Sequence, residues 1–330
     1  MEKSTLEEKL AALLLARREE YLSGEALSRD LGVTRAAVWK GMDRLRKEGW
    51  QVDSVTNRGY RLSQAPDLLT VPLVESFLPS PRTAPVLCYE ELDSTNLQGQ
   101  RLALDGAENK TVVIAGSQTK GSGRMGRTFV SPPGGVYLSY MLAPDCSGER
   151  LSLLTSCAGL AVCRTISAAA GLSASIKWPN DVILEGKKVC GILTKLISDG
   201  ENGSISWAII GIGVNVGQES FPPELADKAI SLRMAGRDVP RAQIAGCLIS
   251  ALDDIFSSSG WKEEDPAILE DLRRLSCTVG RRVTVISPLG QEEGEALDIA
   301  PDGGLVVRFQ DGVRTVSSGE VSVRGLLGYL

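Results

Sequence analysis

Three basic residues lie among the glycines of the segment KGSGRMGR: Lys120, Arg124 and Arg127. Glycine lets backbone N–H groups approach a ligand closely, and lysine and arginine side chains bind phosphate oxygens. A solvated surface loop is the plain alternative, because glycine and charged residues are common in such loops. Three cations placed among flexible glycines favour the phosphate-binding role.

The glycines of this segment also match the dinucleotide-binding spacing G-x-G-x-x-G, at Gly121, Gly123 and Gly126. In that fold the third glycine opens a helix, and the helix N-terminus binds the pyrophosphate. Here the sequence RTFVSPPGG follows, and its paired prolines and glycines oppose a helix. The next run, GVYLSYML, alternates like a strand. The sequence therefore excludes a nicotinamide or flavin fold of this kind, and it contains no P-loop motif.

A second polar cluster follows the strand-like run SIKW. Lys177, Asn180 and Asp181 stand close together there, and a hairpin then presents Lys188. A lysine, an amide and a carboxylate at one sheet edge are suited to ATP and a carboxylate substrate, although an Asn-Asp pair after proline is also a common turn. A further polar residue, Asn215, ends the hydrophobic run GIGVN.

Composition removes several classes of chemistry. The chain has 330 residues and no histidine, which excludes Ser-His-Asp and Cys-His triads and histidine-ligated metals. Its seven cysteines form no C-x-x-C pair and lie in apolar runs, so we expect buried free thiols in a reducing cytosol. The N-terminus does not resemble a signal peptide, and we identify no apolar run of transmembrane length. We therefore expect a cytoplasmic protein without membrane contact.

Three helical segments are expected at the N-terminus. A capping box formed by Ser4 and Glu7 precedes the first, Ser23 caps a short second helix that ends at Gly32, and Thr34 caps the third. Two helices joined by a tight glycine turn are typical of a helix-turn-helix. The following segment, WQVDSVTNRGYRLS, predicts two short strands joined by a turn, which would form a wing.

The charge of this segment supports DNA binding. The net charge of the chain is −5, yet residues 21–61 hold eight Lys or Arg against five Asp or Glu, which leaves −8 for the rest. Any two short helices around a glycine can imitate the motif, so the basic side chains carry the argument. The candidate DNA contacts are Arg35, Lys40 and Arg44 on the third helix, and Arg58 at the wing tip.

The remaining elements predict an α+β fold in three domains. Between residues 66 and 276, strand-like runs fall at 86–90, 111–116, 135–142, 175–178, 188–197 and 204–216, and helical runs at 94–104, 149–170, 239–258 and 266–275. Short turns between strands favour a mixed or antiparallel sheet. From residue 277 onward, short strands with glycine-rich turns predict a small closed β-barrel. The expected domains are therefore 1–65, 66–276 and 277–330, and residues 63–67 are expected to form the linker between the first two.

Five motifs, in their order and spacing, resemble those of the bifunctional biotin–protein ligases that also repress the biotin operon. They are DSTN, the glycine-rich basic loop, KWPND, KKVCGIL and GIGVN. The resemblance covers nearly the whole chain. It implies a winged helix-turn-helix, a class II biotin ligase-like catalytic domain and an SH3-like β-barrel. It also implies the activity: biotin and ATP give biotinyl-5′-adenylate, and the biotinyl group then passes to a lysine of a biotin carboxyl carrier protein.

The resemblance also implies ligands and residue roles. ATP and Mg²⁺ would act as cofactors, and the adenylate-bound protein would form a homodimer on operator DNA. The implied biotin-binding residues are Ser94, Thr95, Asn96, Gln118, Gly121, Ser122, Arg124, Lys188 and Gly191. The implied nucleotide-binding residues are Arg124, Arg127, Phe129, Lys177, Asn180 and Asn215. The implied catalytic residues are Lys188, Arg124 and Asp181, with Asp181 also the candidate Mg²⁺ ligand or proton acceptor.

The chain departs from the family pattern inside the basic loop. Ser122 and Met125 stand where the common pattern has arginine, and Phe129 stands where it often has tryptophan. Two missing cations predict a weaker hold on the phosphates. This favours one alternative, a ligand-sensing repressor with weak or no ligase turnover, whereas the retained Lys188 and Asp181 oppose it. A lipoate or octanoate ligase is the other alternative, but such an enzyme rarely carries a winged helix.

Overall fold

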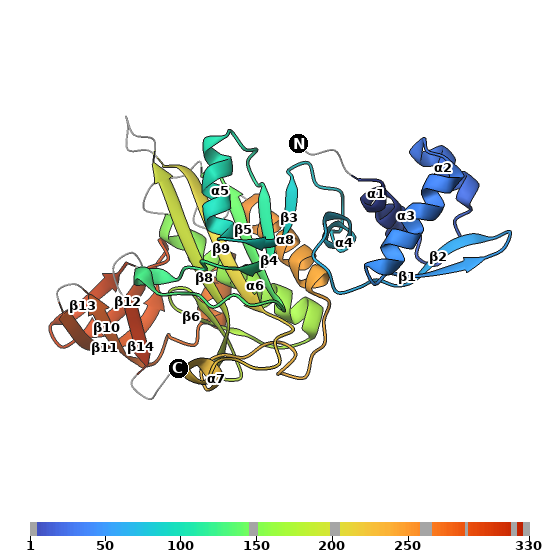
Figure 1. The fold of residues 1–330 in the computed structure, drawn as a ribbon. Coiled ribbons are helices and arrows are strands. Elements are labelled where there is room, and N and C mark those ends of the chain that lie inside the picture. Colours follow the sequence, from blue (N-terminus) through green and yellow to red (C-terminus); the bar gives the residue numbers. More distant parts are fainter. Residues whose placement is uncertain are drawn as a thin grey trace.

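The computed structural model describes residues 5–144, 151–198, 205–257, 266–287, 290–317 and 322–325. Three regions follow one another along the molecule (Figure 1). The N-terminal helices and wing stand at one end, a large sheet covered by helices forms the middle, and the small C-terminal sheet lies at the other end.

The N-terminal region is a winged helix. Its elements are α1 (Leu6–Ala16), α2 (Gly24–Leu31), α3 (Arg35–Lys47), β1 (Gln51–Val55) and β2 (Gly59–Gln64). Ser23 caps α2 by accepting from the N–H of Ala26, and Thr34 caps α3 by accepting from the N–H of Ala37, as predicted. Gly32 ends α2 in the left-handed conformation, at φ 65°, which glycine adopts at little cost.

The first helix begins differently from the prediction. Thr5 and Glu8 form the reciprocal capping box, one residue later than the predicted pair of Ser4 and Glu7. The Glu7 carboxylate instead accepts a hydrogen bond from Arg44 on α3, at 2.6 Å. Ser4-x-x-Glu7 and Thr5-x-x-Glu8 both have the S/T-x-x-E pattern of a capping box. The contact between Glu7 and α3 favours the second pair, because it engages the Glu7 carboxylate elsewhere.

Within the described residues, the central sheet has seven strands in the order β3-β4-β5-β9-β8-β7-β6, and only the pair β3·β4 is parallel. The predicted mixed sheet is therefore confirmed. The strands are β3 (Val86–Leu92), β4 (Val112–Gln118), β5 (Gly135–Leu142), β6 (Ser175–Lys177), β7 (Asp181–Leu184), β8 (Lys187–Ser198) and β9 (Ile205–Asn215). The helices are α4 (Val71–Glu75), α5 (Thr95–Leu104), α6 (Leu151–Ala170), α7 (Pro223–Ala226), α8 (Arg241–Ser257) and α9 (Pro266–Leu275).

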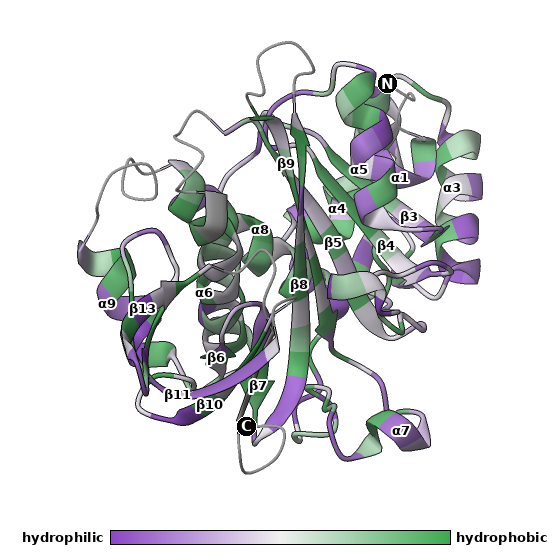
Figure 2. Ribbon diagram, turned by 90° about the vertical axis from the view of Figure 1, so that its left-hand side faces the viewer, coloured by the Kyte–Doolittle hydropathy of each residue, from purple (hydrophilic) through white to green (hydrophobic). Residues whose placement is uncertain are grey.

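Helices cover both faces of this sheet (Figure 2). Helix α5 packs on one face against β4, β5 and β9, and α6 and α8 pack on the other. Strand β4 leads into a loop with one 3-10 turn (Arg124–Gly126) and then into antiparallel β5, so no helix follows the glycines. The exclusion of a dinucleotide-binding fold is confirmed.

One helix in the described part of the chain is long and apolar enough to cross a membrane. The window Leu153–Ala170 in α6 has a mean hydropathy of 1.5, so the prediction that no apolar run reaches such a length is wrong. Within the protein, however, 72% of this window is buried, where α6 packs against α8 and the sheet. A helix buried on most sides is apolar because it belongs to the core.

The C-terminal region is one antiparallel sheet in the order β13-β12-β11-β10-β14. Its strands are β10 (Arg282–Ser287), β11 (Gly290–Ile299), β12 (Leu305–Phe309), β13 (Gly312–Val316) and β14 (Ser322–Gly325). The small antiparallel domain is confirmed, whereas closure of the row into a barrel stays a prediction. Trp178 of the central domain enters its apolar core, and the Trp178 indole N–H donates to the carbonyl of Gly303 at 2.9 Å.

Candidate functional site

A cavity of about 630 Å³ opens where the loop after β4 covers the ends of β3, β8 and β9. The predicted ligand residues line it, with the exceptions of Gly121 and Asn215. The predicted residues that line it are Ser94, Thr95, Asn96, Gln118, Ser122, Arg124, Arg127, Phe129, Lys177, Asn180, Asp181, Lys188 and Gly191. Residues from distant parts of the sequence thus meet in one site.

The parallel pair β3·β4 forms the first part of the site. Leu92 is paired with Gln118, so the start of α5 lies beside the end of β4. The backbone N–H of Thr95 donates to Gln118 Oε1 at 2.8 Å, and Gln118 Nε2 donates to Ser131 Oγ at 2.9 Å. Gln118 is therefore oriented by partners on both sides, which leaves its position fixed before a ligand enters.

A buried hydroxyl extends this network. Ser139 Oγ lies 2.8 Å from both Thr95 Oγ1 and Asn96 Oδ1, and Ser139 is 0% exposed. Asn96 Nδ2 donates to the carbonyl of Leu193 at 3.0 Å. Ser139 is not among the predicted site residues, although a single serine within the apolar run GVYLSYML was a signal for it. Buried polar groups of this kind are retained when every partner is satisfied.

Glycines in β9 make room for this arrangement. A Cβ on Gly211 would lie 2.4 Å from Asn96 Oδ1, and a Cβ on Gly213 would lie 2.4 Å from the Phe129 ring. Gly213 pairs with Gly191 across β8·β9, so the ring rests on a floor without side chains. The glycines of the GIGVN and KKVCGIL motifs therefore serve close packing.

The other end of the cavity is cationic. Five basic residues line the cavity as a whole, and Asp181 is the only acidic group among its lining residues in the described chain. The five are Arg124, Arg127, Lys177, Lys188 and Lys228. Such an excess of cations with one carboxylate suits a polyphosphate ligand.

Arg124 is half-buried in this end. Burial lowers the pKa of its guanidinium from the ordinary value, and nearby Arg127 acts in the same direction while Asp181 opposes it. Arginine remains charged at neutral pH all the same. Arg124 Nη1 donates to Asn180 Oδ1 at 3.3 Å, and Asn180 Nδ2 donates to the carbonyl of Ile192 at 3.0 Å. The loop and the KWPND motif are thereby joined.

Lys188 lines the cavity between Asp181 and the Phe129 ring. Its Nζ is 2.6 Å from Asp181 Oδ1 and 5.6 Å from the centre of the Phe129 ring. The side chains of Lys188 and Asp181 are 24% and 19% exposed, so a ligand can reach the pair. Antiparallel pairing of β7 and β8, with a bulge after Val182, brings the two residues together.

Two predicted ligand residues lie outside the cavity lining. The Gly121 carbonyl accepts from the N–H of Phe129 at 2.9 Å and so closes the loop hairpin. Asn215 is 6% exposed, and its Nδ2 donates to the carbonyl oxygens of Ile230 at 3.2 Å and Lys188 at 3.4 Å. In this structure Asn215 joins the segment after α7 to β8.

A magnesium ion would have few protein ligands here. The described residues contain no group of three His, Cys, Asp or Glu side chains that could hold a metal. Mg²⁺ commonly uses one or two carboxylates together with substrate phosphates and water. Asp181 fits that pattern, because it is the carboxylate beside the cationic end.

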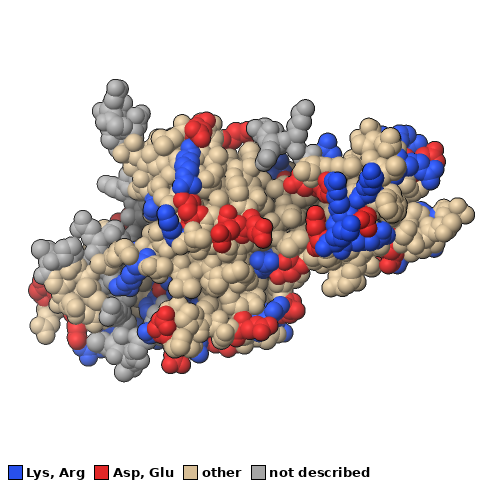
Figure 3. Space-filling view, in the orientation of Figure 1, with Lys and Arg blue, Asp and Glu red and all other residues tan. Residues whose placement is uncertain are grey.

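The winged helix presents basic side chains around α3, and Figure 3 shows Lys and Arg gathered over this region with acidic residues among them. Arg35 and Lys40 are exposed on α3. Arg44 is engaged with Glu7, and the Arg58 guanidinium lies 4.3 Å from the centre of the Tyr21 ring. Trp39, which is not among the predicted contacts, is 57% exposed on the same helix.

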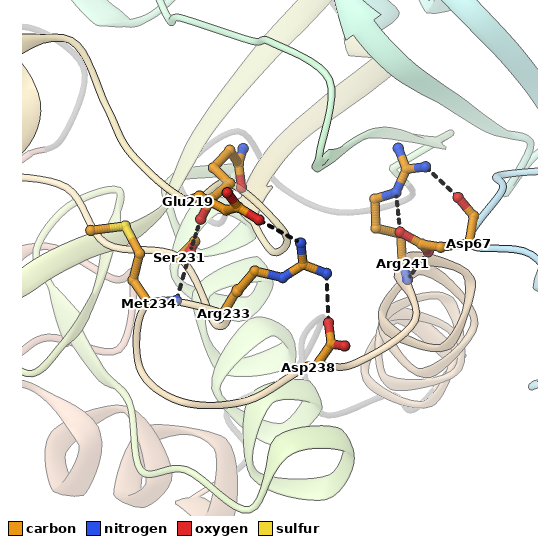
Figure 4. A network of polar contacts seen from close by, with 8 residues as sticks. Asp67, Glu219, Ser231, Arg233, Met234, Asp238 and Arg241 are labelled. Atoms are coloured by element: carbon orange, nitrogen blue, oxygen red, sulfur yellow. Dashed lines mark hydrogen bonds and ion pairs between the residues drawn. The ribbon is translucent and has the colours of Figure 1, made fainter.

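A polar network joins the linker to the central domain (Figure 4). Arg241, the first residue of α8, donates from its backbone N–H to Asp67 Oδ1 at 2.8 Å and from Nε to Asp67 Oδ2 at 2.9 Å. Arg233 lies 2.7 Å from Asp238 and 3.4 Å from Glu219. The predicted linker around Asp67 is therefore fastened to α8.

Three family models match the chain. Residues 7–61 match an HTH domain, residues 89–215 match the biotin/lipoate A/B protein ligase family, and residues 278–324 match the biotin protein ligase C-terminal domain. Each match falls on one of the three structural regions.

Relatives are similar over nearly the full length. The bifunctional ligase/repressor BirA of Bacillus spizizenii is 35% identical, over 97% of this chain and 99% of its own. The bifunctional ligase/repressor BirA of Escherichia coli is 30% identical, over 98% of this chain and 99% of its own. A solved structure of the Aquifex aeolicus biotin protein ligase in complex with biotin and ATP aligns with a TM-score of 0.64 and 29% identity, over 73% of this chain and 99% of that chain.

Proposed function

The chain belongs to the biotin/lipoate A/B protein ligase family, within its bifunctional ligase/repressor group, and we propose that its cavity activates biotin with ATP. It is a biotin–protein ligase with a DNA-binding repressor domain. The observation that carries the proposal is the division of one cavity into a neutral polar end and a cationic end, with the Lys188–Asp181 pair between them.

The neutral end suits the ureido ring of biotin. This ring carries N–H donors and a carbonyl acceptor but no charge, so oriented hydrogen-bonding groups recognise it without ions. Ser94, Thr95, Asn96 and Gln118 supply such groups, and Gly191 leaves space on the floor. The valeryl carboxylate of biotin then extends toward Lys188. Ser122, in the glycine-rich loop, also lines the cavity.

The first step forms a mixed anhydride. A carboxylate oxygen of biotin attacks the α-phosphorus of ATP, the new C–O–P linkage forms, and the bond to the β-phosphate breaks to release pyrophosphate. Lys188 and Arg124 stabilise the charge that develops on the phosphoryl oxygens. Arg127, Lys177 and Asn180 hold the nucleotide, and Phe129 covers the adenine.

The second step transfers the biotinyl group. The amine of a lysine on a biotin carboxyl carrier protein attacks the anhydride carbonyl, an amide forms, and AMP leaves. With no histidine in the chain, Asp181 is the group placed to accept the amine proton. Asp181 would hold Mg²⁺, and the ion would supply neutralisation of phosphate charge during the first step.

Repression uses the N-terminal region. We propose three functional units, 1–65 for operator binding, 66–276 for catalysis and 277–330 for the C-terminal β-barrel, supported by the three matched ranges. Arg35, Lys40, Arg44 and Arg58 contact DNA. Formation of the adenylate favours a homodimer that spaces two winged helices for a palindromic operator. The protein acts in the cytoplasm, where both DNA and carrier are found.

ATP–pyrophosphate exchange tests the ligase. Biotin should support the exchange of labelled pyrophosphate into ATP, whereas lipoate and octanoate should not. If lipoate or octanoate supports the exchange and biotin does not, that acid is the substrate and biotin is not. No exchange with any of the three acids would favour a sensing repressor without turnover.

Footprinting tests the repressor. Operator protection should strengthen when biotin and ATP are both present, because the adenylate forms only then. Protection that is indifferent to both ligands would contradict the coupling between ligand and DNA binding.

A further inference from the structure

Lys228 lines the cavity, although neither the sequence motifs nor the expected roles include it. It follows α7 and is exposed at the cavity rim. Its backbone carbonyl accepts from the N–H of Lys188 at 2.8 Å, and the Lys188 carbonyl accepts from the N–H of Ile230 at 3.0 Å. These two bonds fix the Lys228 backbone beside that of Lys188.

The segment that carries Lys228 is held by several other bonds. Asn215 Nδ2 donates to the carbonyl of Ile230 at 3.2 Å, and Ser231 Oγ donates to the carbonyl of Gln218 at 2.6 Å. Beyond it, Arg233 is paired with Asp238 and Glu219 (Figure 4). The backbone at Lys228 is therefore set before a nucleotide binds, which reduces the entropy lost on binding.

The basic side chains near Lys228 differ in whether they already bond to another protein group. Lys188 is paired with Asp181, and Arg124 bonds to Asn180. Among the described residues, Lys228 has no hydrogen bond or ion pair from its ammonium. The ammonium of neighbouring Lys187, in contrast, donates to the carbonyl of Ala226 at 3.2 Å and does not line the cavity.

We propose that Lys228 binds the outer phosphates of ATP and the pyrophosphate that leaves them, an inference that rests on the proposed ligase function. Lys188 is 24% exposed and lies between the neutral and cationic ends, where the α-phosphate meets the biotin carboxylate. The β- and γ-phosphates continue from there toward solvent. Lys228 is adjacent to Lys188 through its backbone and exposed at the rim, so it adds a cation on that path to those already assigned to the nucleotide.

Lys228 also supplies a positive charge to a cavity in which two loop residues are uncharged. Ser122 and Met125 line the cavity without contributing charge. Lys228 reaches the same cavity from a different segment and restores one positive charge there. Because a mobile ammonium acts as a point charge, it can follow pyrophosphate as it departs.

Lys228→Met, Lys228→Arg and Lys187→Met test the proposal in the full-length protein with biotin and ATP. Removing an exposed cation from a phosphate should raise the KM for ATP, and the KM for pyrophosphate in the exchange reaction, about tenfold in Lys228→Met. Lys228→Arg should recover most of this loss, since it keeps the charge. Transfer from preformed biotinyl-5′-adenylate to carrier protein should stay within twofold of the unsubstituted protein.

Lys187→Met separates a phosphate contact from a merely structural role, because Lys187 holds the same segment. An equal loss in Lys187→Met, an equal loss in the transfer step, or unchanged KM values in Lys228→Met would each overturn the proposal. If the unsubstituted protein shows no biotin-dependent exchange, the ligase function fails and this inference fails with it.

Discussion

The two ends of the cavity are suited to different ligand groups, the uncharged ring of biotin and the polyphosphate of ATP. At the neutral end, Thr95, Asn96 and Ser139 are 3%, 6% and 0% exposed, and Ser139 bonds to both of the others. At the other end, Met125 is 61% exposed and Lys228 lies at the rim, among five cations. An uncharged ring needs fixed donors and acceptors in a dry site, whereas a polyphosphate needs charge that can remain hydrated until the ligand arrives.

This difference predicts that each end can be damaged separately. Changes at the neutral end should alter biotin binding with little effect on ATP, and changes at the cationic end should do the reverse. Lys188 stands between the two ends and should affect the chemical step itself.

The largest effect is expected for Lys188→Met. The Lys188 ammonium lies where carboxylate and phosphate meet, so its loss should slow adenylate formation about 10²- to 10³-fold. Single-turnover formation of biotinyl-adenylate at saturating biotin and ATP measures this rate. Lys195→Met is the matched control, because Lys195 is a half-buried residue of β8 that does not line the cavity. If Lys188→Met slows adenylate formation less than fivefold, Lys188 does not act in the chemical step.

Ser139→Ala should have the next largest effect. Without the hydroxyl, Thr95 and Asn96 lose a buried partner, and the lost bond should weaken biotin affinity about tenfold. Calorimetric titration with biotin, and separately with ATP, measures the effect. Thr165→Val is the matched control, since Thr165 is also buried and bonds only to the carbonyl of Ala161 in the described structure. Equal losses for biotin and ATP would show that Ser139 supports the whole domain.

Ionic strength should separate the two ends without any substitution. Raising KCl from about 0.05 M to about 0.5 M shortens the screening length, so ATP affinity should fall several-fold. Biotin is recognised at its uncharged ring and brings only one carboxylate to Lys188, so its affinity should fall much less than that of ATP. Calorimetry at both salt concentrations compares the ligands directly, and a parallel fall for both would contradict the division of the cavity.

The smallest effect is expected for Asp67→Asn, outside both ends. Asp67 is 48% exposed and Arg241 is 15% exposed, so loss of their ion pair should cost about 1 kcal/mol of stability or less. Thermal unfolding measures this change, and both KM values should stay as in the unsubstituted protein. A changed KM for either ligand would mean that the linker and the cavity are energetically coupled.

Most of the fold could be predicted because its signals are local. Ser23, Gly32 and Thr34 bound helices through bonds that span three or four residues, and the strand at Gly135–Leu142 has the predicted bounds. Local signals failed where neighbours compete. The capping box was predicted at Ser4 and Glu7, but the structure has it at Thr5 and Glu8. Glu7 bonds instead to Arg44, a residue of another helix. The apolar length of α6 was underestimated, and only packing identifies it as a core helix.

The sequence by itself determined the order of domains, the glycine-rich basic loop and the absence of histidine chemistry, since these depend on residue type and spacing. Only the tertiary structure decided how the site is joined. Ser139 meets Asn96 across 43 residues, and Asn96 meets Leu193 across 97. Lys228 came beside Lys188 through backbone bonds that no motif records. Caps and turns depend on bonds between near neighbours, whereas a cavity is formed by sheet register between strands that are distant in the chain.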